Sequence, residues 1–375
     1  MSHIVLRCTR CTEHYEPDVV TLGCKECSSP LDVEYIKDRE FERKAKQPDR
    51  DRPPIELPIN NDTSIISIGE GNTPIISLDR VGSELGLDRL YGKLEYLNPT
   101  GSYKDRGTSI MLAVLREHGV TEVAEDSSGN AGASVAAYAA RSNMSAHIFV
   151  PASTTEAKLK QIRMYGAEVH AIEGPREAAT EAAISFCRER GVVYASHALS
   201  PYFAEGIKSF AYETYQHYST ELPDHIVFPI GNGGLFLGAW KGFQELYANV
   251  RINRIPRLHG VQSSIVMPIV SAFQGLDWDA KQTNYGTTIA GGISVTMPPR
   301  QHQVLHTLQE TCGHAVGVDD PNILRFQKLL AKTEGIYAEP TSAAAFAGLE
   351  NLIYSGVIKK ADVVLVPITG TGLKG

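Results

Sequence analysis

Four of the six cysteines lie within the first 27 residues, in two pairs with the same internal spacing. Cys8 and Cys11 form the first pair, and Cys24 and Cys27 form the second. Two such pairs can supply the four thiolates that close a tetrahedral shell around Zn²⁺. Such a metal would be structural and would stabilise a segment too short to fold on an apolar core alone. The spacing therefore predicts a zinc-ribbon-like segment over residues 1–35, with reduced structural thiols or a redox pair as the alternatives.

A lysine lies in a glycine-containing loop just ahead of a predicted helix. Lys104 belongs to the segment NPTGSYKDRG of residues 98–107, and a helical pattern follows over residues 109–118. The positive end of a helix dipole disfavours a protonated amine, and an unprotonated lysine can act as a nucleophile or form a Schiff base. For this segment taken alone, the alternative is a solvated surface lysine beside Asp105.

A second candidate loop combines small side chains with free backbone N–H groups. The segment DSSGNAGAS of residues 126–134 follows a predicted strand at residues 121–124 and opens a helix of small residues. Ser127, Ser128 and Asn130 offer hydroxyl and amide groups there, and N–H groups at a helix start suit a carboxylate or a phosphate. An ordinary turn that caps the helix is the alternative.

A glycine-rich run separates a predicted strand at residues 225–230 from a predicted helix at residues 235–248. The run is Gly231-Asn232-Gly233-Gly234. Glycine permits positive φ angles, so several N–H groups can converge on an anion at the helix start. The run lacks the G-x-G-x-x-G spacing of dinucleotide-binding loops, and no Walker pattern occurs in the chain. It predicts a phosphate-binding loop of another kind.

Short β-branched segments alternate with longer helical patterns from residue 95 onward. The predicted strands are 121–124, 147–150, 192–195, 225–230, 257–262 and 363–368, and the predicted helices include 109–118, 156–165, 176–190, 235–248 and 322–333. This alternation predicts parallel sheets covered by helices on both faces, which is an α/β fold. Ligands in such folds bind beyond the carboxyl ends of the strands. Thr369 directly follows the last predicted strand and offers a hydroxyl there, although glycine-rich strand ends are also common as plain turns.

The composition predicts a globular protein and argues against two classes of partner. The chain has 375 residues, of which 42% are hydrophobic and 21% charged, and its formal net charge is −7. This length predicts two or three domains. A negative chain has no broad basic face for a nucleic acid, and no apolar run approaches the roughly 18 residues of a membrane helix. The first residues lack the apolar segment of a signal peptide, so we expect a cytoplasmic protein.

A lysine, a phosphate-binding loop, an amide side chain and a hydroxyl are the groups needed to hold pyridoxal phosphate. The segments that carry them also resemble those of a known family. The similar segments are NPTGSYKDRG around Lys104, SSGNAGAS, GNGG, EGIKSFAYE around Glu205 and the final TGTGLKG. They resemble threonine synthases and, more widely, the pyridoxal-phosphate enzymes of fold type II, the tryptophan synthase β fold. The resemblance runs from about residue 67 to the end, and several archaeal and bacterial threonine synthases also carry an N-terminal cysteine knuckle.

The resemblance implies a role for three side chains. Lys104 would form the Schiff base with the cofactor and move protons at the substrate's Cα and Cβ. Asn130 would hydrogen-bond the ring hydroxyl of the cofactor, and Thr369 would face its pyridine nitrogen. A neutral hydroxyl, unlike a carboxylate, does not keep that nitrogen protonated, so elimination and replacement are favoured over transamination.

The resemblance also implies two sites for anionic groups. The cofactor phosphate would be bound by Gly231, Asn232, Gly233 and Gly234. The carboxylate of a small amino-acid substrate would be held by Ser127, Ser128 and the backbone N–H groups from there to Ala131.

In the family, two α/β domains enclose the cofactor, and the resemblance implies the same division here. Residues 36–95 and 206–375 would form the large cofactor-binding domain, which begins with a connector rich in charge and proline at residues 37–58. Residues 96–205 would form a smaller, mobile domain that carries the reactive lysine and closes over substrate to exclude water. We also expect a homodimer, which is common in this fold.

The sequence departs from threonine synthases where the substrate phosphate should bind. The family usually carries an arginine in N-P-x-R-x-E-G, and Phe203 stands in its place. Ala131 replaces a frequent threonine, and residues 288–294 (TIAGGIS) look closer to amino-acid dehydratases. An aromatic ring does not replace the bidentate grip of arginine on a phosphate. The missing positive charge could come from Lys208, Arg163, Lys158 or His197.

We therefore predict a pyridoxal-phosphate-dependent lyase, with conversion of O-phosphohomoserine to threonine and phosphate as the first candidate reaction. A serine or threonine dehydratase, a 2,3-diaminopropionate ammonia-lyase and a β-replacement synthase share its early steps and are the alternatives. A non-catalytic paralogue that binds the cofactor is a remote alternative, because a protein without chemistry has no evident need for the lysine.

Overall fold

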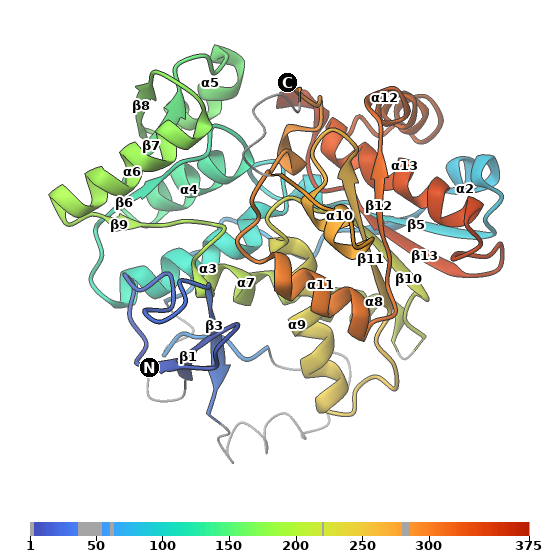
Figure 1. The fold of residues 1–375 in the computed structure, drawn as a ribbon, viewed down its shortest axis with the longest axis horizontal. Coiled ribbons are helices and arrows are strands. Elements are labelled where there is room, and N and C mark those ends of the chain that lie inside the picture. Colours follow the sequence, from blue (N-terminus) through green and yellow to red (C-terminus); the bar gives the residue numbers. More distant parts are fainter. Residues whose placement is uncertain (1–3, 37–54, 61–63, 220, 280–285, 375) are drawn as a thin grey trace.

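The computed structural model describes residues 4–36, 55–60, 64–219, 221–279 and 286–374. Most of the predicted connector at residues 37–58 lies outside these described residues. Within them the strands form a small sheet near the amino end and two larger sheets, whose faces are covered by helices (Figure 1). The structure confirms the predicted α/β fold.

The cysteine segment folds as a three-stranded antiparallel sheet in the order β2-β1-β3. Its strands are β1 (Ile4–Cys8), β2 (His14–Tyr15) and β3 (Leu31–Tyr35). Leu6 and Leu31 are fully buried, because alternate residues of β1 and β3 face α7 (Pro201–Ile207) and the body of the protein. The small sheet therefore packs as part of the main body.

The largest sheet has the strand order β12-β11-β10-β13-β5-β4. Its strands are β12 (Ala315–Val318), β11 (Arg257–Ser263), β10 (His225–Pro229), β13 (Val363–Pro367), β5 (Arg89–Lys93) and β4 (Ile75–Ser77). All neighbouring pairs are parallel except β4 with β5. Every residue of β10 is buried, as expected for a central parallel strand.

Helices cover this sheet on both faces. One face carries Val227 and packs on α2 (Asp79–Leu85), α12 (Asp320–Leu329) and α13 (Pro340–Tyr354). The other carries Phe228 and packs on α8 (Ser209–Tyr218), α9 (Gly234–Ala248), α10 (Pro268–Phe273) and α11 (Gln301–Glu310). Adjacent residues of β10 thus point into two separate apolar cores.

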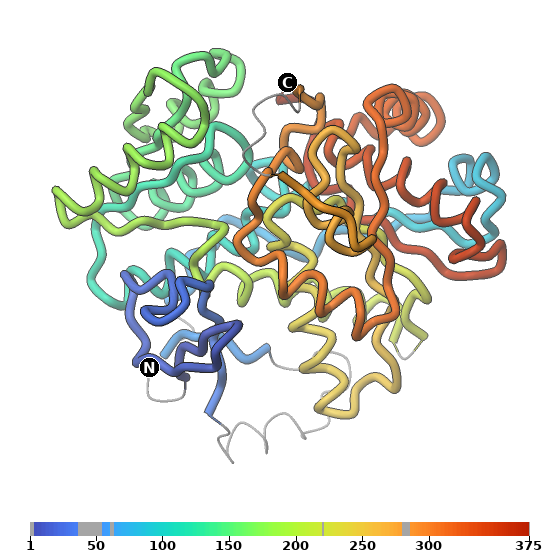
Figure 2. The backbone as a smooth tube through the Cα atoms, in the orientation of Figure 1, coloured from blue at the N-terminus to red at the C-terminus, as the bar shows by residue number. Residues whose placement is uncertain are grey.

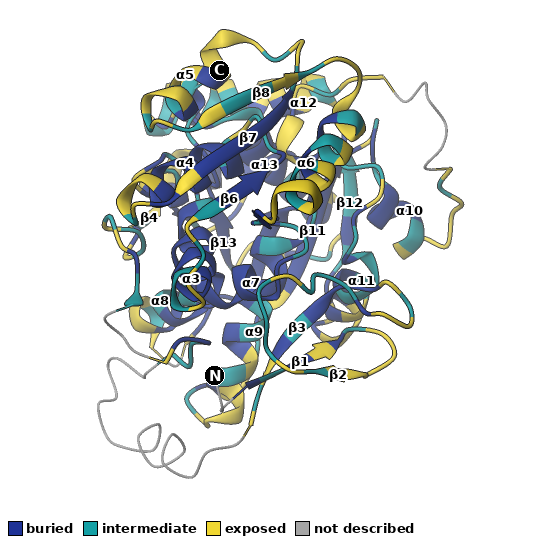
Figure 3. Cartoon of the chain, turned by 90° about the vertical axis from the view of Figure 1, so that its left-hand side faces the viewer, coloured by how far each residue is buried: buried dark blue, intermediate teal, exposed yellow. Residues whose placement is uncertain are grey.

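A four-stranded parallel sheet has the order β8-β7-β6-β9. Its strands are β8 (Glu168–Ile172), β7 (Ser145–Pro151), β6 (Glu122–Glu125) and β9 (Val193–Tyr194). Ala124 and Phe149 face α6 (Arg176–Arg190), and Val123 and Ile148 face the opposite side. That side is covered by α3 (Lys104–Glu117), α4 (Asn130–Arg141) and α5 (Glu156–Met164). Figure 3 shows β6 and β7 largely buried and α6 exposed on its outer side.

The six predicted strands correspond to β6, β7, β9, β10, β11 and β13, with ends that agree within two residues. The other four strands of the two larger sheets, β4, β5, β8 and β12, were not predicted. The sequence of β8, EVHAI, mixes glutamate and histidine with apolar residues, because one of its faces is polar. The predicted helix at residues 322–333 is also interrupted, since α12 ends at Leu329 and a π-helical turn follows over Leu330–Glu334.

The described carboxyl end of the chain, at Lys374, lies between the two larger sheets (Figure 2). The end of β13 and the loop before α3 form an isolated bridge between Ser102 and Gly370. Among the described helices, none combines the length and apolar character needed to cross a bilayer.

Candidate active site

The loop before Lys104 is bound to the loop that follows β13. Tyr103 N donates to Thr369 O at 3.1 Å, and Thr371 N donates to Gly101 O at 3.0 Å. Gly101 has a φ of +85°, and a Cβ there would lie 2.9 Å from Thr371 Cγ2. Glycine is required at this position because it permits both the positive φ and the close approach. The predicted lysine and the predicted hydroxyl are therefore brought together.

The first turn of α3 is fixed by buried hydrogen bonds. Asp105 accepts Thr100 N at 2.7 Å and Thr100 Oγ1 at 2.6 Å, and it also accepts Ser134 Oγ of α4 at 2.7 Å. Burial raises the pKa of Asp105. Lys104 is the first residue of the same turn, and the described part of the chain gives its Nζ no hydrogen bond or ion pair. The backbone is fixed while the amine stays available.

Asn130 is the first residue of α4 and is held by two distant parts of the chain. Its Nδ2 donates to Glu339 Oε2 at 2.9 Å, and its Oδ1 accepts Lys374 Nζ at 3.1 Å. Neither Glu339 nor Lys374 was predicted as a site residue. Their signal in the sequence is weak, because each looks like an ordinary charged residue near the end of an element.

Thr369 belongs to a buried network of hydroxyl and carboxyl groups. Its Oγ1 donates to Glu339 Oε1 at 3.2 Å and lies 2.8 Å from Ser342 Oγ. Burial raises the pKa of Glu339, although its hydrogen bond from Asn130 lowers it in part. One carboxyl group thus contacts both Asn130 and Thr369, the two side chains predicted to flank one ligand ring.

The glycine run forms a tight turn between β10 and α9. Gly233 has a φ of +83°, and a Cβ at this residue would lie 2.7 Å from Val304 Cγ2. A Cβ at Gly231 would lie 2.6 Å from Gly292 O, in the segment 288–294. The run ends at Gly234, where α9 begins, so its N–H groups lie at the positive end of a 15-residue helix. This arrangement suits an anion.

A histidine and a glutamate that lie far apart in the sequence form a buried pair next to this turn. His197 Nδ1 donates to Glu125 Oε1 at 2.7 Å, and His197 Nε2 lies 3.4 Å from Asn232 Nδ2. Burial raises the pKa of Glu125 and lowers the pKa of His197. Sequence analysis considered His197 but not its partner, because Glu125 looks like the polar end of a strand.

Phe203, which stands where threonine synthases usually carry arginine, lies directly beside the lysine. Its ring centroid is 5.4 Å from Lys104 Nζ and 6.1 Å from the ring of His197. The side chain is 1% exposed, and a Cβ on Gly107 would lie 2.6 Å from the ring. The aromatic side chain therefore fills this position and leaves no room there for another group.

Only one of the four basic residues considered as a replacement lies beside Phe203. Lys208 is fully buried, where it pairs with Glu205 at 2.8 Å and with Glu245 at 2.6 Å. Arg163 pairs with Glu156 on the outer surface of α5, the helix that also carries the exposed Lys158. His197 is therefore the candidate that the fold brings to the site.

The predicted carboxylate-binding loop packs closely on the start of α4. Ser127 and Ser128 are half-buried, and Ala131 is buried. Ser127 Oγ accepts Gly129 N at 3.3 Å, and a Cβ at Gly132 would lie 1.9 Å from Ser127 O. Only glycine at position 132 allows this turn, which leaves the N–H groups at the helix start directed toward the loop.

The four cysteines of the amino-terminal segment converge. Sγ atoms of Cys8 and Cys27 are 3.5 Å apart, those of Cys11 and Cys24 are 3.4 Å apart, and those of Cys27 and Cys11 are 3.6 Å apart. A tetrahedral zinc with bonds of about 2.3 Å places its sulfurs about 3.8 Å apart. The backbone N–H groups of Arg10 and Cys11 point at Cys8 Sγ, at 3.4 and 3.5 Å. The cluster has the dimensions of a four-thiolate metal site.

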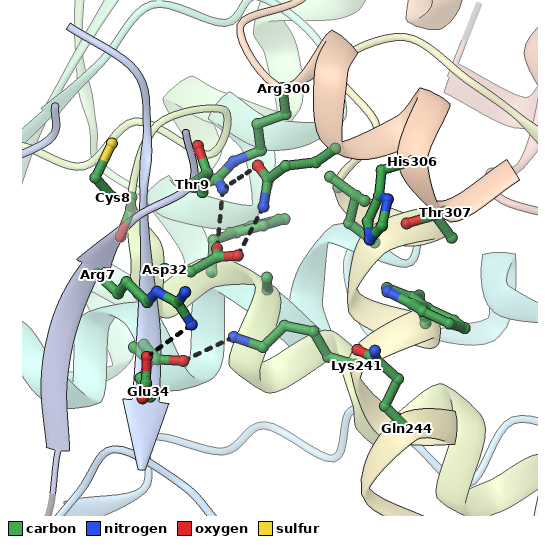
Figure 4. A pocket seen from close by; sticks show the side chains of 18 of the residues that line it. Arg7, Cys8, Thr9, Asp32, Glu34, Lys241, Gln244, Arg300, His306 and Thr307 are labelled. Carbon is green, nitrogen blue, oxygen red and sulfur yellow. Dashed lines mark hydrogen bonds and ion pairs between the residues drawn. The ribbon is translucent and has the colours of Figure 1, made fainter. Parts of the chain in front are cut away.

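A cavity of about 440 Å³ separates the cysteine segment from α9 and α11 (Figure 4). Across it Arg300 pairs with Asp32 at 3.0 Å, and Lys241 Nζ donates to Val33 O at 3.2 Å. Its wall also includes His197, Phe203 and Gly234. The cysteine segment thus encloses a cavity that reaches the residues around the glycine turn.

A family model for pyridoxal-phosphate dependent enzymes matches residues 66–370, which include Lys104, Asn130, the glycine turn and Thr369. The chain belongs to this family. Pyridoxal-phosphate dependent enzymes use a lysine to bind the cofactor and a helix start to bind its phosphate. This chain has a lysine, Lys104, as the first residue of α3 and a glycine turn at the start of α9.

Curated members of the family are similar to this chain over most of its length. A threonine synthase of Methanocaldococcus jannaschii is 34% identical over 375 residues, covering 98% of this chain and 92% of the relative. A threonine synthase of Bacillus sp. (strain ULM1) is 37% identical over 319 residues, covering 85% of this chain and 87% of the relative. The first alignment spans almost the whole chain.

A solved structure from the family supports the fold. An L-serine ammonia-lyase from the fungus Rhizomucor miehei superposes with a TM-score of 0.69 and 21% identity, covering 80% of this chain and 93% of that structure. At this identity the likeness shows the fold alone, which is that of the fold type II pyridoxal-phosphate enzymes.

The residues around Lys104 fit pyridoxal phosphate. The amine has no partner within the described chain, and the buried Ser102 Oγ, two residues before it, also has none. The turn at Gly233 keeps the start of α9 free of side chains, as a bound phosphate requires. Asn130 and Thr369 are two polar side chains held by the same carboxyl group, that of Glu339.

Proposed function

We propose that this pyridoxal-phosphate-dependent lyase carries out elimination and replacement on a small amino acid, and that its reaction is that of a threonine synthase, from O-phosphohomoserine to threonine and phosphate. The likeness to threonine synthases over 98% of the chain carries this proposal. The meeting of the loops around Lys104, Asn130, Gly233 and Thr369 supports it.

Three side chains hold and use the cofactor in this proposal. Pyridoxal phosphate, when bound, withdraws electrons from the bonds at the substrate's Cα. Lys104 Nζ would hold the cofactor and move protons at the substrate's Cα and Cβ. Asn130 would orient the cofactor ring, and Thr369 would offer a neutral hydroxyl to its pyridine nitrogen. Glu339 fixes both of these side chains through its hydrogen bonds, so it acts as a positioning residue.

Backbone groups hold the two anions. The N–H groups of Gly231, Asn232, Gly233 and Gly234 bind the cofactor phosphate at the start of α9. Ser127, Ser128 and the N–H groups up to Ala131 bind the substrate carboxylate at the start of α4. Both sites rest on helix dipoles and need no cationic side chain.

We also propose that residues 96–205 move as a small domain against the large domain of residues 36–95 and 206–375. The four-stranded and six-stranded sheets support this division, because they share no strand. Closure of the small domain would keep bulk water away from the reacting substrate and admit only the one water that must add at Cβ to give threonine. A cytoplasmic homodimer completes the proposal and rests on the resemblance to the family alone.

Zinc binding by Cys8, Cys11, Cys24 and Cys27 is a further part of the proposal. The sulfur spacing and the N–H groups that point at Cys8 Sγ support it. With four thiolate ligands the metal has no open position, so its role is to hold β1, β2 and β3 together.

A second candidate function rests on Phe203. Arginine, the usual phosphate ligand, is absent, and a buried aromatic ring occupies its place beside Lys104. An unphosphorylated substrate such as serine, threonine or 2,3-diaminopropionate needs no such ligand. In that case His197 beside Phe203 is the candidate general base, because its Nδ1 hydrogen is held by Glu125 and its Nε2 lone pair can take up a proton.

One assay separates the two candidates. Holoprotein is incubated with O-phosphohomoserine while inorganic phosphate and threonine are followed together. Equal release of both supports threonine synthase. Turnover of serine, threonine or 2,3-diaminopropionate to a keto acid and ammonia, with O-phosphohomoserine inert, rejects that assignment and supports the second candidate. The homodimer is tested separately, by light scattering of the same preparation.

A further inference from the structure

A cluster of histidine and glutamate side chains lies on the four-stranded sheet, away from the catalytic loops. His147 is the third residue of β7, and Glu168 and His170 are the first and third residues of β8. The strands pair in parallel with His147 opposite Glu168 and Phe149 opposite His170. Because strand residues alternate between faces, these three side chains share the face covered by α6. The catalytic loop after β6 begins at the carboxyl end of its strand, whereas this cluster lies toward the amino ends.

The three side chains direct their ligand atoms at one point. His147 Nδ1 is 3.1 Å from His170 Nε2 and 3.4 Å from Glu168 Oε2, and His170 Nε2 is 3.6 Å from Glu168 Oε1. A tetrahedral zinc with bonds of about 2.0 to 2.2 Å to nitrogen and oxygen separates its ligands by about 3.3 to 3.6 Å. The two nitrogen–oxygen distances, each to a different oxygen of Glu168, lie in this range, and the nitrogen–nitrogen distance of 3.1 Å is slightly shorter.

A fourth side chain fixes which nitrogen of His147 faces the others. His147 Nε2 lies 2.6 Å from Glu122 Oε1, the first residue of β6. The carboxylate takes the Nε2–H, so neutral His147 presents the lone pair of Nδ1 toward His170 and Glu168. Carboxylate–histidine–metal chains of this kind orient the histidine and strengthen it as a ligand.

A hydrogen bond between the two histidines explains only part of the arrangement. His170 can donate one N–H to His147 Nδ1, but the Glu168 oxygen 3.4 Å from the same lone pair is also an acceptor. His147 Nδ1, His170 Nε2 and the Glu168 oxygen then have a single proton between them. A divalent cation is attracted by all three at once.

We propose that His147, His170 and Glu168 bind a divalent transition-metal ion of the zinc class, with Glu122 as the carboxylate behind His147. Imidazole nitrogen with a single carboxylate favours Zn²⁺, Co²⁺ or Ni²⁺ over Mg²⁺ or Ca²⁺. The side chain of Glu168 is 66% exposed, so the remaining coordination position faces solvent.

The position of the site gives the metal a mechanical role. β8 is the edge strand of its sheet and pairs only with β7. Phe149 stacks on His170 at 4.4 Å, and Phe186 of α6 lies 4.8 Å from His147, so apolar rings enclose the site from one side. A metal bound to both strands fastens this edge beneath α6.

The test is Zn²⁺ binding by the full-length holoprotein, measured by calorimetric titration and by metal counting after gel filtration. The wild type is compared with His170→Asn, Glu168→Gln and Glu122→Gln, and with His217→Asn on α8 as the matched control. We expect His170→Asn to bind one Zn²⁺ fewer per chain and Glu122→Gln to bind about 10- to 100-fold more weakly. His217→Asn binds as the wild type does. The Zn²⁺ binding of each variant is compared with that of the wild type. Zinc bound by the four cysteines contributes equally to both and does not affect the difference.

Two outcomes overturn the proposal. One is a wild type and a His170→Asn variant, both folded by circular dichroism, with the same Zn²⁺ stoichiometry and affinity. The other is a wild type that binds no Zn²⁺ beyond the amount released when the cysteines are modified by a thiol reagent. If His170→Asn fails to fold, Glu168→Gln decides, because its exposed side chain is replaced without loss of packing, and affinity equal to wild type rejects the site.

Discussion

Lys104 is held by its neighbours along the chain, and among the described residues its amine has no hydrogen bond or ion pair. Asp105 accepts three hydrogen bonds, and Arg106 is paired with Glu95 at 2.6 Å and with Glu213 at 2.6 Å. Both residues belong to the same helical turn as the lysine. The side chains of Asp105 and Arg106 therefore have their partners without using Lys104 Nζ. An amine that must react with a carbonyl group has to be left available in this way.

Replacement of this lysine tests its role directly. We expect Lys104→Ala to lower kcat by about 10²- to 10⁴-fold, because no other described amine lies in its place to move the proton. The variant should also lose the visible absorbance of the cofactor-bound protein. Lys160→Ala, on the exposed surface of α5, is the matched control. Activity retained by Lys104→Ala would show that another residue carries the chemistry.

The buried pair beside Phe203 gives a second prediction at this scale. Glu125 holds His197 through Nδ1, so Glu125→Gln replaces the carboxyl group that accepts the Nδ1 hydrogen and orients the ring. We expect kcat to fall at least about tenfold with little change in KM, and the pH profile of kcat to shift. A merely structural pair would instead lower the unfolding temperature and leave the pH profile unchanged. Measuring both quantities on the same preparation separates the two roles.

Single residues also show where sequence analysis reached its limit. Lys104, Asn130 and Thr369 were predicted because each lies in a loop whose small neighbours are unusual. Glu339 and Lys374 were missed, although both contact Asn130. Their contacts join residues more than 200 positions apart, and no local pattern records such a distance. The burial of Phe203 beside Lys104 was likewise not predictable from the local sequence.

The glycine turn and the convergence of the four cysteines are two features that the local sequence predicted. Gly231 to Gly234 indicated a turn with positive φ, and the structure has it at Gly233. The spacing of the cysteines indicated that they converge. β8 was missed because its polar face, which includes His170, conceals the alternation that marks a strand. A helix or strand is predictable where its apolar and polar residues alternate regularly. Polar side chains at positions such as His170 interrupt that alternation.

The turn at Gly233 gives a prediction with an internal control. Gly233→Ala adds a Cβ 2.7 Å from Val304 Cγ2 and also strains a φ of +83°, whereas Gly356→Ala strains a φ of +72° in open space. Each variant should lose about 1 to 2 kcal/mol of stability from the left-handed conformation. We expect only Gly233→Ala to weaken pyridoxal-phosphate binding, by at least about tenfold in a cofactor titration. Equal cofactor affinity in the two variants would contradict the phosphate-binding role.

The cysteine sheet gives a prediction about metal content. Cys11→Ser removes one exposed thiol of the cluster, and Cys312→Ser removes an exposed thiol elsewhere. We expect the first variant to lose the zinc that a thiol reagent releases from the wild type, and the second to keep it. The unfolding temperature should fall only in the first, because β1, β2 and β3 lose their crosslink. A wild type without thiol-releasable zinc would leave the four cysteines as reduced structural thiols.

At the scale of the whole molecule, buried charges join its two larger sheets. Arg106 lies on α3, which packs on the four-stranded sheet, and Lys93 lies at the end of β5 in the six-stranded sheet. Glu213 of α8 pairs with both, at 2.6 Å to Arg106 and 2.7 Å to Lys93. These ion pairs therefore position the loop before Lys104 relative to the six-stranded sheet. The composition of the chain does not reveal such pairs.

These ion pairs make stability depend on pH in a direction that follows from Glu213. Burial alone would raise its pKa, but the charges of Arg106 and Lys93 outweigh burial and lower the pKa to about 2. In the unfolded chain a glutamate has a pKa of about 4.3. A lowered pKa contributes stability that is full above the unfolded value and is lost as pH falls toward the folded value. Glu213 should therefore stabilise the protein above about pH 5 and contribute progressively less down to about pH 2.

Glu213→Gln tests this dependence. At pH 7 the variant leaves Arg106 buried without one of its charged partners, so we expect a loss of about 3 to 5 kcal/mol in urea unfolding. The difference from wild type should shrink as pH falls from 4.5 toward 2.5, because the wild-type carboxylate becomes neutral as well. Glu156→Gln removes the exposed pair with Arg163 and should cost less than about 1 kcal/mol at every pH. A Glu213→Gln difference that stays constant from pH 7 to pH 2.5 would mean that packing around residue 213, and not its charge, holds the two sheets together.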